Sequence, residues 1–591
     1  MGLGSLLNIG KQSVLVNQAA LQTIGHNIAN AGVDGYSRQE VIPQNNPSLE
    51  TNYGFLGTGV RVDTVRQLSD RFLNTQITKF KSELGALRSQ SEGAVLAEAF
   101  LNEAGTEAGI NASINKFFLS AEDLATAPEG VAERNGLLNS AEILIEKFNS
   151  LGVAIEDMMI TADNDILRAI TEVNQLVTKM GELNTRITVS ETNGNTANDL
   201  RDERQRTLEN LSELTDTSFI EEKDGALLVF VGRSVPFVSK GVSNKLVGVN
   251  NPDNVVGNSP PVALKLVKFE DKAGNQTDLT TRITGGEIGG LIKFRDTTLR
   301  ELLDNVNNIA ATLVNEVNII HRSGFGLDGS TDLNFFQPLK ISVSASSSNS
   351  KDATTSNKNV QAILSDSRII DPTTLTMADY KIDFTSATTF TLTDVDTNQK
   401  LDTTKVSING APLGTDSSIT EFAMSGSTVT AEFEGLRVAV QKFGGNPEKG
   451  DSFDISIRKG AAKALALNQL IAADTNKVAA ADAPNIPGDN GNALALANLR
   501  GKTVASRDSA SIGGFMNVII SNFGTLSADL ASRYELSEQV TDSLKATREE
   551  VAGVSIDEEM ANILLFQQNF NASSHLMSIV SELMKSILDI L

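Results

Sequence analysis

The sequence contains no cysteine and no tryptophan, and only three histidines in 591 residues. The lack of cysteine excludes disulfides, thiolate metal sites and cysteine nucleophiles. Chance in a proteome that uses little cysteine would explain it, and so would an exported protein that avoids stray thiol chemistry. No histidine has a second ligand residue three or four positions away, so none belongs to a recognisable metal motif. The histidines are His26, His321 and His575.

Long apolar runs and basic blocks are also missing. No run approaches the length needed to span a bilayer, and the N-terminus lacks a basic head followed by a removable hydrophobic segment. Leu6 occupies the position where a myristoylation signal has Ser or Thr. The net charge of −23, from 73 acidic and 50 basic residues, opposes binding to a phosphate backbone. We therefore expect no membrane insertion, no cleaved signal peptide and no nucleic acid partner.

Catalytic and ligand-binding motifs are not recognisable. Asp394, Asp396 and Asn398 begin like a calcium loop, but Gln399 stands where the sharp turn needs glycine and Lys405 where the loop needs glutamate. No Gly-Lys-Ser/Thr loop is present for a nucleotide. We therefore expect a protein that is not an enzyme and that holds no cofactor and no metal.

One cluster of acidic residues needs a separate interpretation. Asp199, Asp202 and Glu203 alternate with arginines at 201, 204 and 206. Paired acids can act in catalysis, but interleaved opposite charges at this spacing favour an ion network on the surface of a helix. We predict the ion network.

The two ends of the chain carry apolar residues at helical spacing. A row of this kind lies along one face of a helix and is covered only by a partner helix. At the N-terminus Leu7, Val14, Leu21 and Ile28 recur every seven residues, with Leu3 and Ile24 beside them. At the C-terminus the row is Ile563, Phe570, Met577, Met584 and Leu591, flanked by Phe566, Leu576, Val580, Leu583 and Ile587.

Between these ends the sequence pattern changes from one typical of helices to one typical of strands, and then back to helices. Apolar residues three and four apart predict long helices within 73–87, 166–187 and 299–320. Alternating segments and turn signals predict strands over about 217–267 and 341–457. The sequence thus predicts an elongated, multidomain α+β chain, whose terminal helices pair as a coiled coil and whose mainly β domain is inserted into a helical bundle.

The predicted segments follow from this order. They are an axial helix and turn over 1–64, which pairs with 551–591; a helical bundle over 65–340, with its strand-rich stretch; a mainly β insertion over 341–460; return helices of the bundle over 461–550; and a C-terminal axial helix over 551–591.

Short motifs link the chain to a known family. The segment His26–Gln39, reading HNIANAGVDGYSRQ, resembles the signature near the start of bacterial flagellar rod, hook and junction proteins. Its ending Tyr36-Ser37-Arg38-Gln39 is similar to that of junction members, where hook and rod proteins usually have Gly-Phe-Lys. The family commonly has Thr-Pro where this chain has Val33-Asp34. The ending Tyr36–Gln39 therefore favours the junction branch of the family.

Further matches extend the resemblance over most of the chain. Asn198–Arg204 resembles a segment that closes a later helix, and His321–Gly329 resembles the exit from the helical domain. Gly488–Leu496 resembles the re-entry, and Ser555–Asn562 resembles the tail of axial flagellar proteins. The inserted β region has no such match.

The resemblance implies a structural subunit that assembles at the hook tip and adapts the hook to the filament. It implies an extracellular place on the flagellum, type III export without a cleaved signal, and self-assembly into a ring or tube. The implied partners are the hook protein, a second junction protein, the export apparatus and a chaperone on the C-terminal helix. We predict an assembly interface formed by Leu7, Val14, Leu21, Asn27, Ile28, Asn30, Tyr36, Ile563, Phe566, Phe570, Met577, Val580, Met584 and Ile587.

Two alternatives stay open at this point. One is a hook or rod subunit, which Tyr36-Ser37 disfavours. The other is an exported surface enzyme with its site in the β insertion, which the missing nucleophile and base disfavour.

Overall fold

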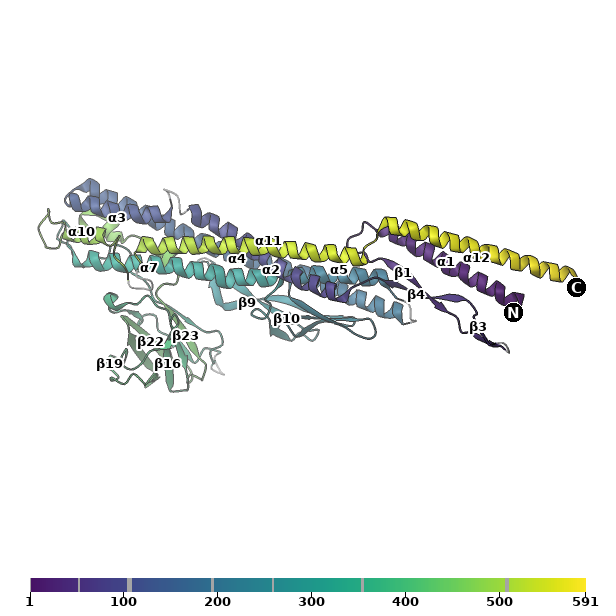
Figure 1. Ribbon diagram of the computed structural model, residues 1–591. Coiled ribbons are helices and arrows are strands. Elements are labelled where there is room, and N and C mark those ends of the chain that lie inside the picture. Colours follow the sequence, from purple (N-terminus) through teal and green to yellow (C-terminus); the bar gives the residue numbers. More distant parts are fainter. Residues whose placement is uncertain are drawn as a thin grey trace.

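The computed structural model describes residues 2–51, 54–103, 109–192, 196–257, 260–351, 356–504 and 510–590. The chain forms a long helical rod, with a narrow arm at one end and a β domain beside the other end (Figure 1). Within the described residues, no helix combines the length and apolarity that crossing a bilayer would require.

The arm is formed by the two chain ends. Helix α1 (Leu3–Asn30) and helix α12 (Ile556–Ile590) lie antiparallel, and both termini are at its tip (Figure 1). The chain leaves α1 through a turn in which Gly35 has a φ of +69°, a conformation that glycine adopts without strain. It then forms the antiparallel pair β1 (Gln39–Asn45) and β4 (Val60–Gln67), which packs against α1. The predicted pairing of the terminal helices is confirmed.

A bundle of long helices forms the rod. Helix α4 (Val131–Glu191) is its centre, because apolar residues three and four apart bury one side of it along most of its length. Helices α3, α5, α6 and α7 contact α4, while α11 packs along α2. Their bounds are α2 Arg71–Glu103, α3 Ile110–Thr126, α5 Asn198–Leu214, α6 Gly286–Lys293, α7 Leu299–Ser323 and α11 Ile512–Ala552, with a π-helical turn at Phe294–Thr298.

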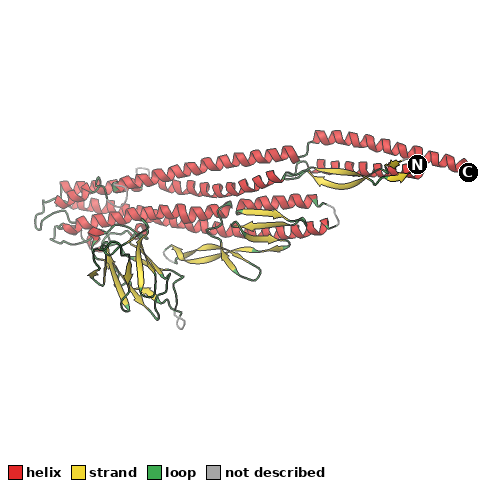
Figure 2. Cartoon of the chain, turned by 60° about the horizontal axis from the view of Figure 1, so that its bottom comes forward, coloured by secondary structure: helices red, strands yellow, loops and turns green. Residues whose placement is uncertain are grey.

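The strand-rich stretch after α5 forms two small antiparallel sheets beside α4 (Figure 2). The first consists of β5 (Thr217–Glu221), β6 (Leu227–Val231), β7 (Val235–Ser239) and β8 (Val242–Ser243). The second consists of β9 (Lys245–Val256), β10 (Val262–Glu270) and β11 (Gln276–Asp278).

The inserted domain contains two antiparallel sheets packed around an apolar centre that includes Phe390, Phe422 and Phe453. One sheet holds β12 (Ser342–Ala345), β15 (Tyr380–Phe384), β16 (Thr389–Asp394), β17 (Gln399–Lys400), β20 (Glu421–Ala423) and β23 (Ser452–Ser456). The other holds β13 (Val360–Ala362), β14 (Arg368–Ile369), β18 (Val406–Ile408), β19 (Ala411–Pro412), β21 (Thr428–Phe433) and β22 (Leu436–Lys442).

Short helices bring the chain back into the bundle beside its distal end. They are α8 (Ala461–Ala464), α9 (Gln469–Ala473) and α10 (Gly491–Asn498). At this end Phe117 packs against Phe335 and Phe336, with ring centroids 5.8 and 5.9 Å away. The prediction of an elongated α+β chain with a β-rich insertion is confirmed, while the residue boundaries of the five segments stay a prediction.

Candidate assembly junction

Segment Tyr36–Gln39 lies where the arm meets the bundle. The side chain of Ser37 donates to Asp202 Oδ1 at 2.8 Å, and its backbone N–H donates to Asp202 Oδ2 at 2.9 Å. Asp202 belongs to α5, so these two bonds fix the turn after α1 to the bundle. Burial raises the pKa of the Asp202 carboxyl to about 6, although both Ser37 donors and the charge of Arg206 act in the opposite direction.

Asn27, near the end of α1, holds the same segment from the arm side. Its Nδ2 donates to the carbonyl of Gln39 at 2.9 Å, while its Oδ1 accepts from the Gln39 N–H at 3.0 Å and from the Tyr36 hydroxyl at 2.9 Å. Burial, with the nearby Asp199 and Asp202 carboxylates, raises the pKa of the Tyr36 phenol. The phenol therefore keeps its proton and stays a donor.

Arg38 connects the segment to the last two long helices. Its backbone N–H donates to the carbonyl of Ala552, the last residue of α11, at 2.8 Å. Its guanidinium donates to Glu559 at 2.6 Å and to Glu558 at 3.0 Å. Glu559 is 1% exposed, and removing Arg38 would leave its carboxylate without this cation.

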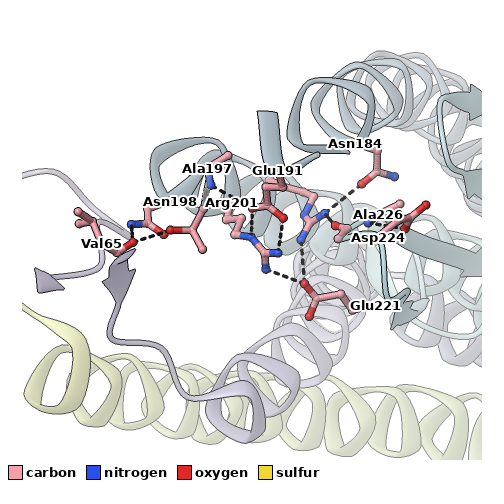
Figure 3. Close-up of polar contacts among 12 residues, drawn as sticks. Val65, Asn184, Glu191, Ala197, Asn198, Arg201, Glu221, Asp224 and Ala226 are labelled. Atoms are coloured by element: carbon pink, nitrogen blue, oxygen red, sulfur yellow. Dashed lines mark hydrogen bonds and ion pairs between the residues drawn. The ribbon is translucent and has the colours of Figure 1, made fainter. Parts of the chain in front are cut away.

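Gln39 completes the attachment to the start of α5. Its Nε2 donates to Asp199 at 2.7 Å, and its Oε1 accepts from Asn198 at 3.3 Å. Asn198 also donates to the carbonyl of Val65 in β4 at 2.9 Å, as Figure 3 shows. Together the residues of Tyr36–Gln39 thus bond α1, α5, the end of α11 and the start of α12.

Behind this segment, the arginines of α5 bind the neighbouring elements. Arg201 donates to Glu191 and to Glu221, each at 2.7 Å (Figure 3). Arg204 is buried and donates to Asn184 at 3.2 Å and to the carbonyl of Gly225 at 2.5 Å. The predicted position of the ion network, on the surface of a helix, is therefore wrong. The network lies partly inside the protein, because these side chains join α4, α5 and β5.

The resemblance also placed Asn198–Arg204 at the end of a helix, whereas these residues begin α5. A cavity of about 760 Å³ lies beside the junction. It is lined by the turn after α1, by α5 and by residues 548–555, where α11 passes into α12.

The predicted N-terminal row is only half-buried in the single chain. Residues Leu7, Val14, Leu21 and Ile28 all keep part of their surface exposed. The deepest side chains of α1 are Val16, Asn17, Ala20, Ile24 and Asn27. Ser13 bonds Ser573 of α12 at 2.7 Å, and a Cβ on Gly10 would lie 2.7 Å from Met577. Helix α1 therefore comes closest to α12 at small residues, which the search for a row of apolar residues does not find.

The predicted C-terminal row divides into two parts. Ile563, Phe566, Phe570 and Met577 are half-buried and Val580 is buried, on the side of α12 that faces α1. Met584 and Ile587 are exposed, and Leu591 lies outside the described residues.

Three predicted interface residues lie at the junction. Asn27 is fully buried inside the chain. We correct that prediction, because its amide serves the internal turn rather than a surface. Tyr36 is half-buried and bonds Asn27, and Asn30 donates to the carbonyl of His26 at 2.9 Å. The interface role of the other residues in the predicted set stays a prediction.

Sequence reasoning missed the partners of the motif. The sequence shows Asp202 as one of a cluster of acids, but it does not indicate that Asp202 and Glu559 accept hydrogen bonds from Ser37 and Arg38. These contacts join residues far apart in the chain, and no local pattern indicates them. Within the ranges that the structure describes, no group of three or more His, Cys, Asp and Glu side chains could hold a metal ion.

Two parts of the chain match models of known protein families. Residues 96–336 match the family model of the helical domain of flagellar hook-associated protein FlgK. Residues 546–590 match the model of the C-terminal region of flagellar basal body rod proteins.

Similar proteins cover the whole chain. Flagellar hook-associated protein 1 of Salmonella typhimurium is 24% identical over all of both chains, and that of Escherichia coli (strain K12) is 23% identical, again over all of both chains. The flagellar hook junction protein FlgK from Burkholderia pseudomallei has a similar fold, with a TM-score of 0.66 and 15% identity. That similarity covers 81% of this chain and 100% of the solved one.

Proposed function

The chain belongs to the family of flagellar hook-associated proteins, and we propose that it is a structural subunit which assembles at the hook tip and joins the hook to the filament. Its place is the flagellum. The observation that carries the proposal is the arm, whose two terminal helices pair and still leave apolar side chains uncovered. Such helices are unfavourable in water and become stable when copies pack together.

The junction supports the same role. A subunit that joins two polymers must transmit the position of its arm to its bundle. Ser37 and Arg38 bind α5, the end of α11 and the start of α12, so they tie together the segments that cross between the two parts. We propose that this junction fixes the angle of the arm.

The proposed interface between copies uses the half-buried row of α1 and the predicted row of α12, in which Val580 is buried in the single chain and the other residues keep part of their surface exposed. It consists of Leu7, Val14, Leu21, Ile28, Asn30 and Tyr36, with Ile563, Phe566, Phe570, Met577, Val580, Met584 and Ile587. The proposed assembly is a ring or a short tube of identical copies.

We also propose the surroundings of the subunit. The hook protein lies on one side of the ring and a second junction protein on the other. The chain leaves the cell through the type III export apparatus without a cleaved signal and becomes extracellular. Before export, a chaperone covers α12, whose apolar surface would otherwise be exposed. The proposed role is structural and not catalytic.

Deletion of residues 563–591 tests this function. We expect a soluble protein with an intact bundle that no longer joins the hook, so that electron microscopy shows hooks without filaments. Circular dichroism of the purified variant is the control for folding. A truncated chain that still supports filaments would contradict the proposal.

A hook or rod subunit is the second candidate, favoured by the match of residues 546–590 to rod proteins. A strain that lacks the whole gene separates the two. Complete hooks without filaments support the junction role, whereas missing hooks support the alternative.

A further inference from the structure

A small β-hairpin stands out from the arm. Strands β2 (Leu49–Thr51) and β3 (Gly54–Leu56) pair antiparallel, with Glu50 opposite Phe55. Phe55 is 75% exposed, the highest value for a large apolar side chain in the described part of the chain, and Leu49 is 59% exposed. A two-stranded hairpin is at best marginally stable alone. An exposed aromatic side chain on it therefore needs a surface to cover it.

The base of the hairpin is fixed to the first half of α1. Asn46 donates to the side chain of Gln12, and a Cβ on Gly59 would lie 3.4 Å from Ile9 Cα. From this base the hairpin extends beyond β1 and β4, near the N-terminus (Figures 1 and 2). Its base is thus held by α1, while Leu49 and Phe55 on its strands stay exposed.

Helix α12 carries an open apolar row on its outer flank. The middle of this row lies about a quarter-turn or more around the helix from the middle of the residues that face α1, and its last member, Ile587, stands seven positions after the buried Val580. From Leu576 onward its members are three or four residues apart, and Leu565 stands eleven residues, or about three turns, before Leu576, so that all of them stay in line. The row consists of Leu565, Leu576, Ile579, Leu583 and Ile587, all exposed in the single chain.

Charge is nearly absent from all three surfaces of the arm. Residues 3–30 contain Lys11 as their single Asp, Glu, Lys or Arg, and residues 41–60 contain Glu50 alone. Residues 560–581 contain none, and the charges of the last part of α12, Glu582, Lys585 and Asp589, are about a quarter-turn or more around the helix from the middle of the row. Across the chain these residue types make up 21%. Depletion of charge is typical of the centre of an interface between proteins. It indicates that the hairpin and the row are both covered by an apolar partner.

We propose that the β2–β3 hairpin of one copy packs on the outer row of α12 of the next copy. Every copy then offers one exposed aromatic side chain, Phe55, and one receiving row, and a contact between two different surfaces repeats into a ring or a helical tube. A second copy fits better than another partner because both uncovered surfaces belong to the same arm and share its lack of charge. The inference rests on the proposed function and specifies its contact.

Disulfide trapping tests the contact directly, because the wild-type chain contains no cysteine. Phe55→Cys is combined with Leu576→Cys, Ile579→Cys or Leu583→Cys, and flagella are oxidised after assembly. We expect at least one pair to give covalent dimers and longer ladders of this chain. Ser13→Cys with Ser573→Cys is the control for oxidation, since these two hydroxyls lie 2.7 Å apart within one chain.

Two results would overturn the contact. One is the absence of any product between copies while the control pair closes, and the other is a disulfide from Phe55→Cys that forms only within one chain. Phe72→Cys is the matched negative partner, because Phe72 is 68% exposed but lies on α2 in the bundle. It should give no product with Leu583→Cys.

A point variant distinguishes this inference from the proposed function. Phe55→Ser removes this aromatic side chain without touching the α1–α12 contact, and we expect at least a tenfold fall in the fraction of hooks with filaments. Phe72→Ser should change that fraction less than twofold. Normal filaments with Phe55→Ser would reject the hairpin contact and leave the junction role intact, since that role is tested by the deletion of 563–591.

Discussion

The buried His321 makes a specific prediction about stability at low pH. Its Nδ1 donates to the carbonyl of Leu333 at 2.6 Å, and its Nε2 accepts from the Ala479 N–H at 2.9 Å. The second bond requires a neutral ring. Burial, together with the charge of Arg134, lowers the pKa of His321 from 6.5 to about 4. Above pH 6.5 both the folded and the unfolded chain hold a neutral ring, so this residue adds no pH dependence there.

Between pH 6.5 and about pH 4, His321 is protonated in the unfolded chain but stays neutral in the folded chain. The free energy of unfolding therefore falls with decreasing pH, and the full loss is about 3 kcal/mol at 1.4 kcal/mol per unit. About 2 kcal/mol of it is gone at pH 5. Asp202 and Asp216, whose pKa values burial raises to about 6, act in the opposite direction, because they bind protons more readily when folded.

The measurement must therefore be a difference between proteins. Urea unfolding of the wild type and of His321→Gln is compared at pH 7.5 and pH 5.0, and the wild type should lose about 2 kcal/mol more. Hydrogen exchange at the Ala479 amide locates the effect, since that amide loses its acceptor on protonation. His575→Gln is the matched control, because His575 is exposed on α12. Equal losses in wild type and His321→Gln would refute the reasoning.

Two further predictions concern the junction and the bundle. Arg38→Met leaves the Glu559 carboxylate buried without its cation and should destabilise the start of α12 by about 3–5 kcal/mol, seen as faster hydrogen exchange there; adding Glu559→Gln should recover part of the loss. Gly290→Ala places a Cβ 2.3 Å from the Ala86 carbonyl oxygen and should cost about 1–3 kcal/mol, seen as a lower Tm. Gly136→Ala, with nothing within 4 Å in an exposed stretch of α4, should leave the Tm unchanged or raise it.

The helices could be predicted because their apolar spacing is local. The face of α1 that contacts α12 could not be predicted, and Gly10 and Ser13 show the reason. Close contact between two helices needs small residues, and these give no apolar signal. A strict seven-residue row also drifts around a helix of 3.6 residues per turn, so the predicted row is displaced from the contact. The role of Asp202 could not be predicted for another reason, because its hydrogen-bond partner Ser37 is 165 residues away in the sequence.

The chemistry of the arm and of the junction is opposite, and the difference has a mechanical consequence. The arm offers nearly uncharged surfaces, so its contacts are apolar and tolerate small displacements between copies. The junction instead uses directional bonds from Ser37, Arg38 and Gln39 to Asp202, Glu559 and Asp199. Directional bonds fix an angle, whereas apolar contacts mainly fix proximity. A subunit that joins two polymers of different geometry needs both properties, with an adaptable arm inside the assembly and a fixed connection to the bundle.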